Sequence, residues 1–160
     1  MTIKFHSIRG WTNQLDQDVS VKTPLRLSQF VHLKNPGGGA TLRPDGELTL
    51  FKGFQWDGAS GPTIDGPSTH RASAAHDAMY RMLKRGLFDG VDRVAICLGV
   101  VVLSGEDDFH ENIRRVADSM FYELLLEDGM PPWRAKIWWA AVRASPWAAQ
   151  RKYLWLNRWM

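Results

Sequence analysis

The sequence predicts an α+β fold, in which a small antiparallel sheet from the N-terminal third is packed by three to five helices. Residues 1–56 contain short runs with strand character, whereas apolar residues recur with helical spacing from His70 onward. A glycine run at 37–39 and the turn signal Pro44-Asp45-Gly46 separate the strand candidates. This order, with strands first and helices afterwards, is typical of α+β proteins.

The expected strands are short and lie close together. They cover residues 25–27, 30–33, 40–42 and 47–51. Pro44-Asp45-Gly46 stands between the last two and is typical of a turn that joins antiparallel strands. We therefore expect a hairpin between residues 40 and 51.

The helices follow in the remaining two thirds of the chain. Asp128-Gly129 marks a helix end, and Pro131-Pro132 marks the next helix start. Residues 91–104 are expected to be helical because the run is longer than a usual strand, although its Val and Ile content leaves a strand open. The other expected helices cover about 69–85, 110–127, 133–143 and 146–157. We expect one domain over 1–160, with strands in 1–56, a helical core in 69–145 and an aromatic, basic C-terminal helix in 146–160.

Length and cysteine content narrow the class of protein. A chain of 160 residues fits one domain and buries roughly 70% of the surface that its unfolded form exposes. It can therefore fold without disulfides or a structural metal. The single cysteine, Cys97, excludes an intrachain disulfide and a thiolate cluster, and we expect it to be buried. The apolar run around it is shorter than the about 20 residues that cross a bilayer, and the polar N-terminus lacks a secretory apolar segment. We expect a soluble protein made in the cytoplasm.

The charge distribution is more informative than the net charge. A formal charge of +3, from 20 basic and 17 acidic residues, is no strong signal for nucleic-acid binding. After Met130, however, basic residues meet no acidic residue, and six of the eight tryptophans lie there. Three roles stay open for this Trp/Arg-rich C-terminus: packing into the core, an assembly contact, or binding at a membrane surface.

Residues suited to chemistry gather where the strand region meets the first long helix. Asp57 stands on a glycine-rich turn, and His76-Asp77 follows on the helix. Loops carry reactive groups while flanking elements hold them in place, so we expect a site at this joint. The candidate catalytic residues are Asp57, His76, Asp77 and Asp118, and the candidate binding residues are Ser60, His70, Tyr80 and Arg81.

Imidazole and carboxylate groups together suit acid–base catalysis or a divalent metal. His76, Asp77 and Asp118 are the candidate ligands, because imidazole suits zinc and carboxylates suit manganese or magnesium. His76 and Asp77 point about 100° apart on a helix, so they cannot hold one small ligand unaided. The structural alternative is an aromatic contact of His76 with Tyr80 and a helical ion pair of Asp77 with Arg81.

The other candidates also have structural alternatives. Asp118 is either a partner of Arg114 or Arg115, at the surface or between helices, or a residue that faces the His-Asp pair. Asp57 is a natural acceptor in an Asx turn. We expect His70 to be a helix-start residue, because a spacing of six places it and the next histidine on different sides of a helix.

Four sequence blocks stand out between residues 48 and 145. They are Phe54-x-x-Asp57-Gly58-Ala59-Ser60-Gly61-Pro62, Ala75-His76-Asp77-Ala78-x-Tyr80-Arg81, Arg114-x-x-Ala117-Asp118-x-x-Phe121, and Glu127-Asp128-Gly129-Met130 with Arg134-Ala135 and Ala141-Val142-Arg143. Together they resemble the phage and prophage family catalogued as domain of unknown function 1353. The resemblance implies a viral or prophage origin and points to Asp57, His76, Asp77 and Asp118. The apolar segment 86–109 and the end after Pro146 depart from the family pattern.

Two classes of function remain. In the first, the chain is a phage- or prophage-encoded accessory protein with a hydrolase-like, metal-dependent or acid–base site acting on a cell-wall or nucleotide substrate. In the second, it is a virion or host-interaction protein whose Asp and His residues form a structural network, and the C-terminus binds phage structural proteins or a host protein. We expect it in the host cytoplasm, or in the virion if structural. Serine hydrolase chemistry is not expected, because Gly61 and Pro62 follow Ser60 directly and the Gly-x-Ser-x-Gly pattern is not met.

Overall fold

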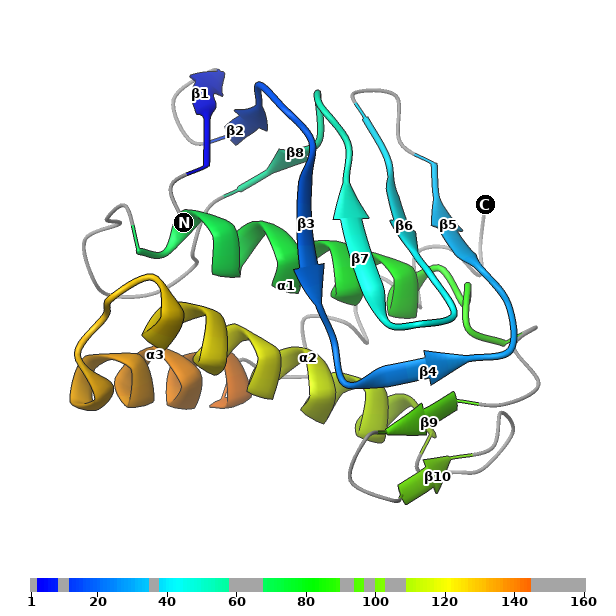
Figure 1. The fold of residues 1–160 in the computed structure, drawn as a ribbon. Coiled ribbons are helices and arrows are strands. Elements are labelled where there is room, and N and C mark those ends of the chain that lie inside the picture. The colour runs from blue at the N-terminus through cyan, green and yellow to red at the C-terminus, as the bar shows by residue number, and fades with distance from the viewer. Residues whose placement is uncertain are drawn as a thin grey trace, which may run out of the picture.

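Ten short strands and three helices make up the described part of the chain (Figure 1). The structure is a computed structural model that describes residues 3–8, 12–34, 38–57, 68–89, 94–96, 100–102 and 109–144. The elements are β1 (Phe5–Ile8), β2 (Thr12–Leu15), β3 (Val19–Lys22), β4 (Leu25–Leu27), β5 (Val31–Leu33), β6 (Ala40–Leu42), β7 (Glu47–Leu50), β8 (Gln55–Trp56), α1 (His70–Lys84), β9 (Val94–Ile96), β10 (Val100–Val102), α2 (Phe109–Glu127) and α3 (Pro132–Ala144). The α+β class is confirmed.

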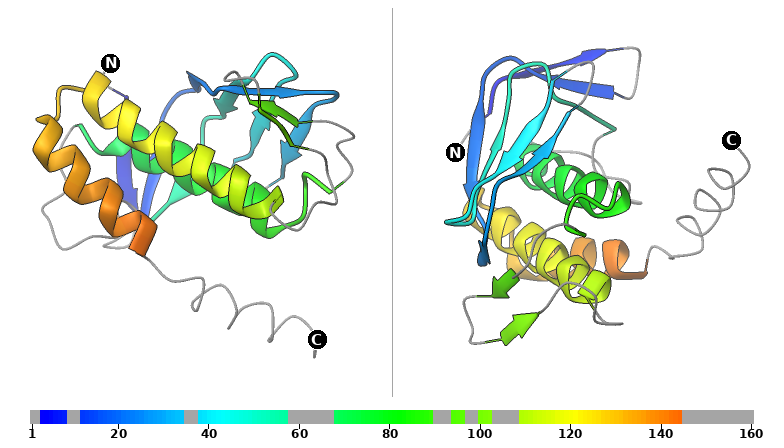
Figure 2. Two further views of the ribbon diagram at one scale, coloured as in Figure 1. Left: turned by 90° about the horizontal axis from the view of Figure 1, so that it is seen from below. Right: turned by 90° about the vertical axis from the view of Figure 1, so that its right-hand side faces the viewer.

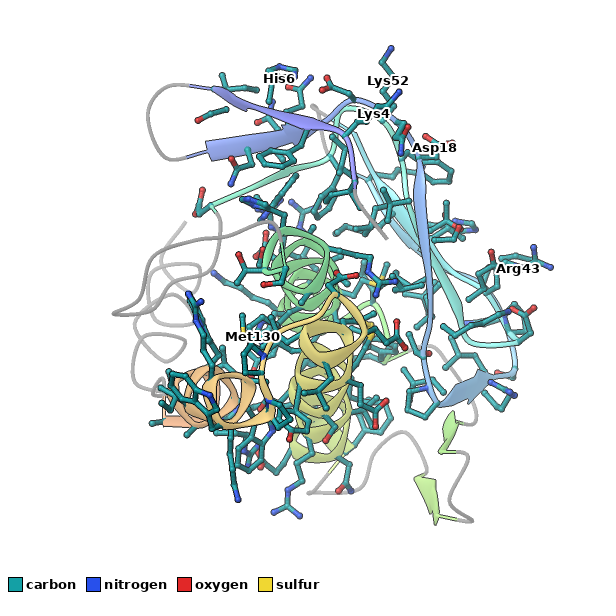
Figure 3. All side chains as sticks on the ribbon, turned by 60° about the vertical axis from the view of Figure 1, so that its left-hand side comes forward. Lys4, His6, Asp18, Arg43, Lys52 and Met130 are labelled. Carbon is teal, nitrogen blue, oxygen red and sulfur yellow. The ribbon has the colours of Figure 1, made fainter. Side chains whose placement is uncertain are left out.

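The largest sheet is antiparallel and has the strand order β3-β7-β6-β5. Its side chains alternate between buried and more exposed along each strand, as expected for a sheet with one covered face. Asp18, Arg43 and Lys52 are exposed around this sheet and point away from the helices (Figure 3). Two three-stranded sheets, with the orders β1-β2-β8 and β10-β9-β4, complete the β part of the described chain.

The predicted hairpin is present between β6 and β7, where Leu42 pairs with Leu48. The Gly46 amide donates to the Arg43 carbonyl at 2.9 Å and closes the turn. Gly46 has a φ of 82°, and a Cβ there would lie 2.3 Å from the carbonyl oxygen of Leu25. Glycine is therefore required at this turn for both backbone angle and space.

The helices lie on one side of the large sheet (Figures 1 and 2). α1 contacts β5, β7 and β8, α2 packs on α1, and α3 packs on α2. The predicted end of α2 is confirmed, because the amides of Gly129 and Met130 donate to the carbonyls of Leu126 and Leu125 at 3.0 and 2.9 Å, which is a Schellman ending. Met130 lies at the turn that leads from α2 to α3 (Figure 3).

The helix expected over residues 91–104 is wrong. Residues 94–96 and 100–102 form the strands β9 and β10, which pair antiparallel. β9 also pairs with β4, where Leu25 lies opposite Ile96. The β-branched residues of β9 therefore extend a sheet whose strand β4 lies some 70 positions earlier in the sequence. The length of the run favoured a helix, but pairing with this distant strand decides the structure.

Several expectations fall outside the described residues. They concern Ser60, Cys97 and the C-terminal helix at 146–157. Among the residues that are described, no helix is long and apolar enough to cross a membrane.

Candidate functional site

α1 presents two polar faces to two different neighbours. His76 and Tyr80, one helical turn apart, have ring centroids 4.2 Å apart and both contact α2 through Asp118. Asp77 and Arg81, the next pair along, form an ion pair at 2.6 Å. Both side-chain pairs expected from the spacing of four are therefore confirmed.

The first face meets a buried carboxylate. Asp118 is fully buried, and its Oδ1 lies 2.9 Å from His76 Nε2 and accepts a hydrogen bond from the Tyr80 hydroxyl at 2.7 Å. Arg143 from α3 donates to Oδ2 at 3.0 Å. We call His76, Tyr80, Arg114, Asp118 and Arg143 the Asp118 cluster. It joins side chains from all three described helices.

Two arginines enclose this cluster on the side of α3. Arg114 lies 4.0 Å from Asp118 Oδ2, donates to the Tyr80 hydroxyl at 3.2 Å and donates to the Arg143 carbonyl at 2.9 Å. Glu111, one turn before Arg114 on α2, accepts from both Arg114 and Arg143 at 3.2 Å. The two arginines are thus shared between two carboxylates, so the buried charges are paired.

The cluster keeps Asp118 ionised. Burial alone would raise the pKa of Asp118, but hydrogen bonds from His76, Tyr80 and Arg143 outweigh it and hold the pKa below its ordinary value. Burial, together with the ionised Asp118, raises the pKa of the Tyr80 phenol, which therefore stays protonated and acts as a donor.

An ionised Asp118 also fixes the state of the histidine ring. A carboxylate only accepts hydrogen bonds, so Nε2 of His76 carries the proton that it donates. In the neutral ring, Nδ1 is then the basic nitrogen, and no described residue hydrogen-bonds to it. The His76 side chain is 15% exposed, whereas that of Asp118 is 0% exposed. The pair therefore has a buried orienting end and a more accessible basic end.

The second face of α1 meets the end of β8. The indole Nε1 of Trp56 donates to Ser73 Oγ at 3.0 Å, and the guanidinium of Arg81 lies 5.3 Å from the centre of the Phe54 ring. These two contacts hold residues 54–56 along α1. Asp57, which is exposed, comes next in the chain. We call Asp57, Asp77 and Arg81 the Asp77 cluster.

The pKa of Asp77 is shifted in the opposite direction to that of Asp118. Burial raises the pKa of Asp77, and the negative charge of Asp57 raises it further. The Arg81 guanidinium lowers it, but not enough to restore the ordinary value. Asp57 is thus near enough to the His-Asp pair to act on it, through Asp77.

Comparison with known families gives one match. The family described as "Protein of unknown function (DUF1353)" matches residues 42–142, which is well over half of the chain. The chain belongs to this family. Comparison with curated proteins and with solved structures gives no match.

The DUF1353 match contains the Asp77 cluster and all of the Asp118 cluster except Arg143, which comes one residue after its end. The structure brings His76 and Asp118 together, and it brings Asp57 towards Asp77. Within the described residues, no group of three or more His, Cys, Asp or Glu side chains could hold a metal ion. His76 and Asp118 meet each other whereas Asp77 pairs with Arg81, so the three do not form such a group, and metal binding stays a prediction.

The remaining candidates have structural partners. His70 begins α1, as expected, and its ring packs on Phe5 with centroids 4.0 Å apart. The alternative that placed Asp118 at the surface is wrong, whereas the alternative in which it faces His76 is confirmed, and Asp118 also lies 4.0 Å from Arg114. Asp118 lies outside the apolar stripe of α2, and it is buried because α3 packs against this side of the helix.

Sequence reasoning missed three residues of the arrangement. Arg143 lies in the last of the four sequence blocks, and this position could have identified it as a site residue. Glu111 gave no signal beyond its helical spacing to Arg115, with which it pairs at 3.2 Å. Arg71 donates to Asp128 at 3.0 Å and to Glu127 at 2.7 Å, which ties the start of α1 to the end of α2.

Proposed function

We propose that this DUF1353 protein is a phage- or prophage-encoded accessory protein in which His76 and Asp118 perform acid–base chemistry of a hydrolase-like kind. The observation that carries the proposal is the 2.9 Å contact between a fully buried carboxylate and one nitrogen of a partly exposed histidine. In this arrangement the carboxylate orients the ring and stabilises the imidazolium that forms when Nδ1 takes a proton.

The surrounding residues suit this role. Tyr80 and Arg143 hold both oxygens of Asp118, so the carboxylate cannot rotate away from the ring. The Asp77 cluster lies on the neighbouring face of α1 and provides a second carboxyl group whose pKa is raised. Asp118 on α2 and Asp77 on α1 thus have pKa shifts in opposite directions, which is typical of acid–base sites. The substrate class that we propose is a cell-wall or nucleotide compound.

The proposal is tested with His76→Gln and His76→Ala. Glutamine keeps a donor for Asp118 but cannot transfer a proton. We expect wild-type turnover on peptidoglycan or on phosphodiester and ester substrates, loss of turnover in both variants, and partial recovery of His76→Ala with added imidazole. Turnover that His76→Gln retains would contradict the role of the histidine.

A metal-dependent version of the site is tested beside it. Elemental analysis of the wild-type protein and of a His76→Ala/Asp118→Ala variant would detect zinc, manganese or magnesium. About one equivalent of metal that is lost in the variant would support a metal centre rather than acid–base chemistry by the side chains alone.

A second candidate function rests on a specific observation as well. Asp118 links α1, α2 and α3, so the cluster also suits a purely structural network in a virion or host-interaction protein. In that case the wild-type protein has no turnover on any of these substrates, and His76→Gln lowers the melting temperature. Its binding partner would be a phage structural protein or a host protein.

A further inference from the structure

α3 carries a face that the described fold leaves uncovered. Ala135 and Trp138 are buried against the rest of the protein. On the opposite side of the helix, Trp133 is 68% exposed and Ile137 is 49% exposed. Ala140 and Ala144 continue the same stripe at helical spacing and are also exposed. We call Trp133, Ile137, Ala140 and Ala144 the outer face of α3.

The position of α3 makes this face accessible. α3 packs on α2 and lies at the outside of the helical layer, on the side away from the large sheet (Figure 2). Large apolar side chains that are exposed one helical turn apart, rather than singly, indicate an interaction site. The question is then what covers them.

The charges around the outer face select one kind of partner. α3 contains no acidic residue, and Lys136 is exposed beside the outer face, whereas Arg143 is already paired with Asp118 and Glu111. Two copies of the chain that met through this face would bring their basic flanks together, which disfavours self-association. An anionic partner is favoured instead.

The aromatic composition narrows the partner further. Trp is the residue type that favours the boundary between lipid head groups and acyl chains, and basic side chains beside it extend towards anionic head groups. α3 has 13 residues, or about 20 Å of helix, which is enough to lie along a bilayer surface but too short to cross it. The helix can therefore lie in the plane of the interface with its outer face towards the lipid, while the opposite side stays packed on α2.

We propose that the outer face of α3 binds the surface of an anionic lipid bilayer. Trp133 and Ile137 enter the boundary between head groups and acyl chains. Lys136, which is exposed on the flank of the stripe, lies at the level of the phosphate groups. The sheet and α1 then face away from the lipid.

The test is flotation of the full chain with vesicles made of equal parts phosphatidylglycerol and phosphatidylcholine, and with vesicles of phosphatidylcholine alone. We expect binding to the anionic vesicles that weakens at high salt. Trp133→Ala/Ile137→Ala is expected to bind at least about tenfold more weakly, because the variant lacks the two large apolar side chains that move from water into the bilayer on binding. Lys136→Glu is expected to weaken binding to the anionic vesicles and to have no effect on neutral ones.

The matched control is Phe30→Ala/Phe51→Ala. These two side chains are the other large exposed apolar residues of the described chain, at 52% and 40%, and they lie beside the sheet. The control should bind vesicles like the wild type. Equal losses in both double variants, or equal binding to neutral and anionic vesicles, would overturn the proposal. A dimer in sedimentation velocity that disappears in Trp133→Ala/Ile137→Ala, without vesicle binding, would assign the face to a second copy and also overturn it.

Discussion

His76 and Asp118 lie 42 positions apart in the sequence, yet Nε2 of the histidine and Oδ1 of the aspartate are 2.9 Å apart. The contact joins α1 to α2 and fixes which ring nitrogen carries the proton. The catalytic and the structural hypotheses predict different results for substitutions of these two residues.

The first prediction concerns the ring of His76. Because Asp118 is ionised and accepts the Nε2 proton, the neutral ring should be the Nε2–H tautomer. Nitrogen-15 chemical shifts of the histidine side chain would measure this. In Asp118→Asn the preference should weaken, because a carboxamide can also donate. A dominant Nδ1–H tautomer in the wild type would contradict the hydrogen bond.

The second prediction concerns the weight of Asp118 in stability. Asp118→Ala leaves buried donors from α1 and α3 without their acceptor, so we expect the free energy of unfolding to fall by about 3–5 kcal/mol. Tyr80→Phe removes two hydrogen bonds, the one that the hydroxyl donates to Asp118 and the one that it accepts from Arg114, and should cost about 1–3 kcal/mol. Chemical denaturation measures both. Glu123→Gln, at an exposed position of the same helix, is the control and should stay within about 0.5 kcal/mol.

The third prediction is the pH dependence that Asp118 causes. Its pKa is lower in the folded chain than in the unfolded chain, so its contribution is present above the ordinary value near 3.8 and is lost as the pH falls through the folded pKa. The stability difference between wild type and Asp118→Asn should therefore be constant near neutral pH and shrink in acid below about pH 4. A difference that persists into strong acid would show that the loss is one of packing.

The fourth prediction concerns Asp77, for which the sign is opposite. Burial raises its folded pKa, so the group favours folding below the unfolded pKa, and this contribution is lost as the pH rises through the folded pKa. At neutral pH its charge therefore costs stability, and Asp77→Asn should raise the melting temperature there. Asp57→Asn removes a neighbouring charge and should give a smaller increase. A lower melting temperature for Asp77→Asn would mean that the ion pair with Arg81 outweighs burial.

The fifth prediction concerns Arg71, which ties α1 to the end of α2. Its side chain and that of Asp128 are only 9% and 3% exposed, with 2.9 Å between Nη2 and Oδ1. Arg71→Met removes the cation from a buried carboxylate, and we expect a loss of about 3–5 kcal/mol in unfolding free energy. Arg115→Met breaks an exposed ion pair with Glu111 and should cost less than about 1 kcal/mol. Equal losses of unfolding free energy in the two variants would show that burial of the Arg71 ion pair does not set its contribution.

The sequence predicted the local structure well where the signals were local. The β6–β7 hairpin follows from Pro44-Asp45-Gly46, and the end of α2 follows from Asp128-Gly129. The same holds for contacts within a helix, such as His76 with Tyr80. It failed for residues 94–102, because an apolar run of that length fits a helix or two strands, and the pairing of β9 with β4 decides between them.

The sequence by itself thus determined the α+β class, the family, and the residue types at the joint of sheet and helices. Only the tertiary structure decided that His76 faces Asp118 while Asp77 is influenced by the charge of Asp57, and that Arg143 completes the first cluster. The physical reason is that helical spacing fixes the angle between neighbouring side chains but not the element that each one meets. That depends on how α2 and β8 pack against α1, which is set by contacts between residues far apart in the chain.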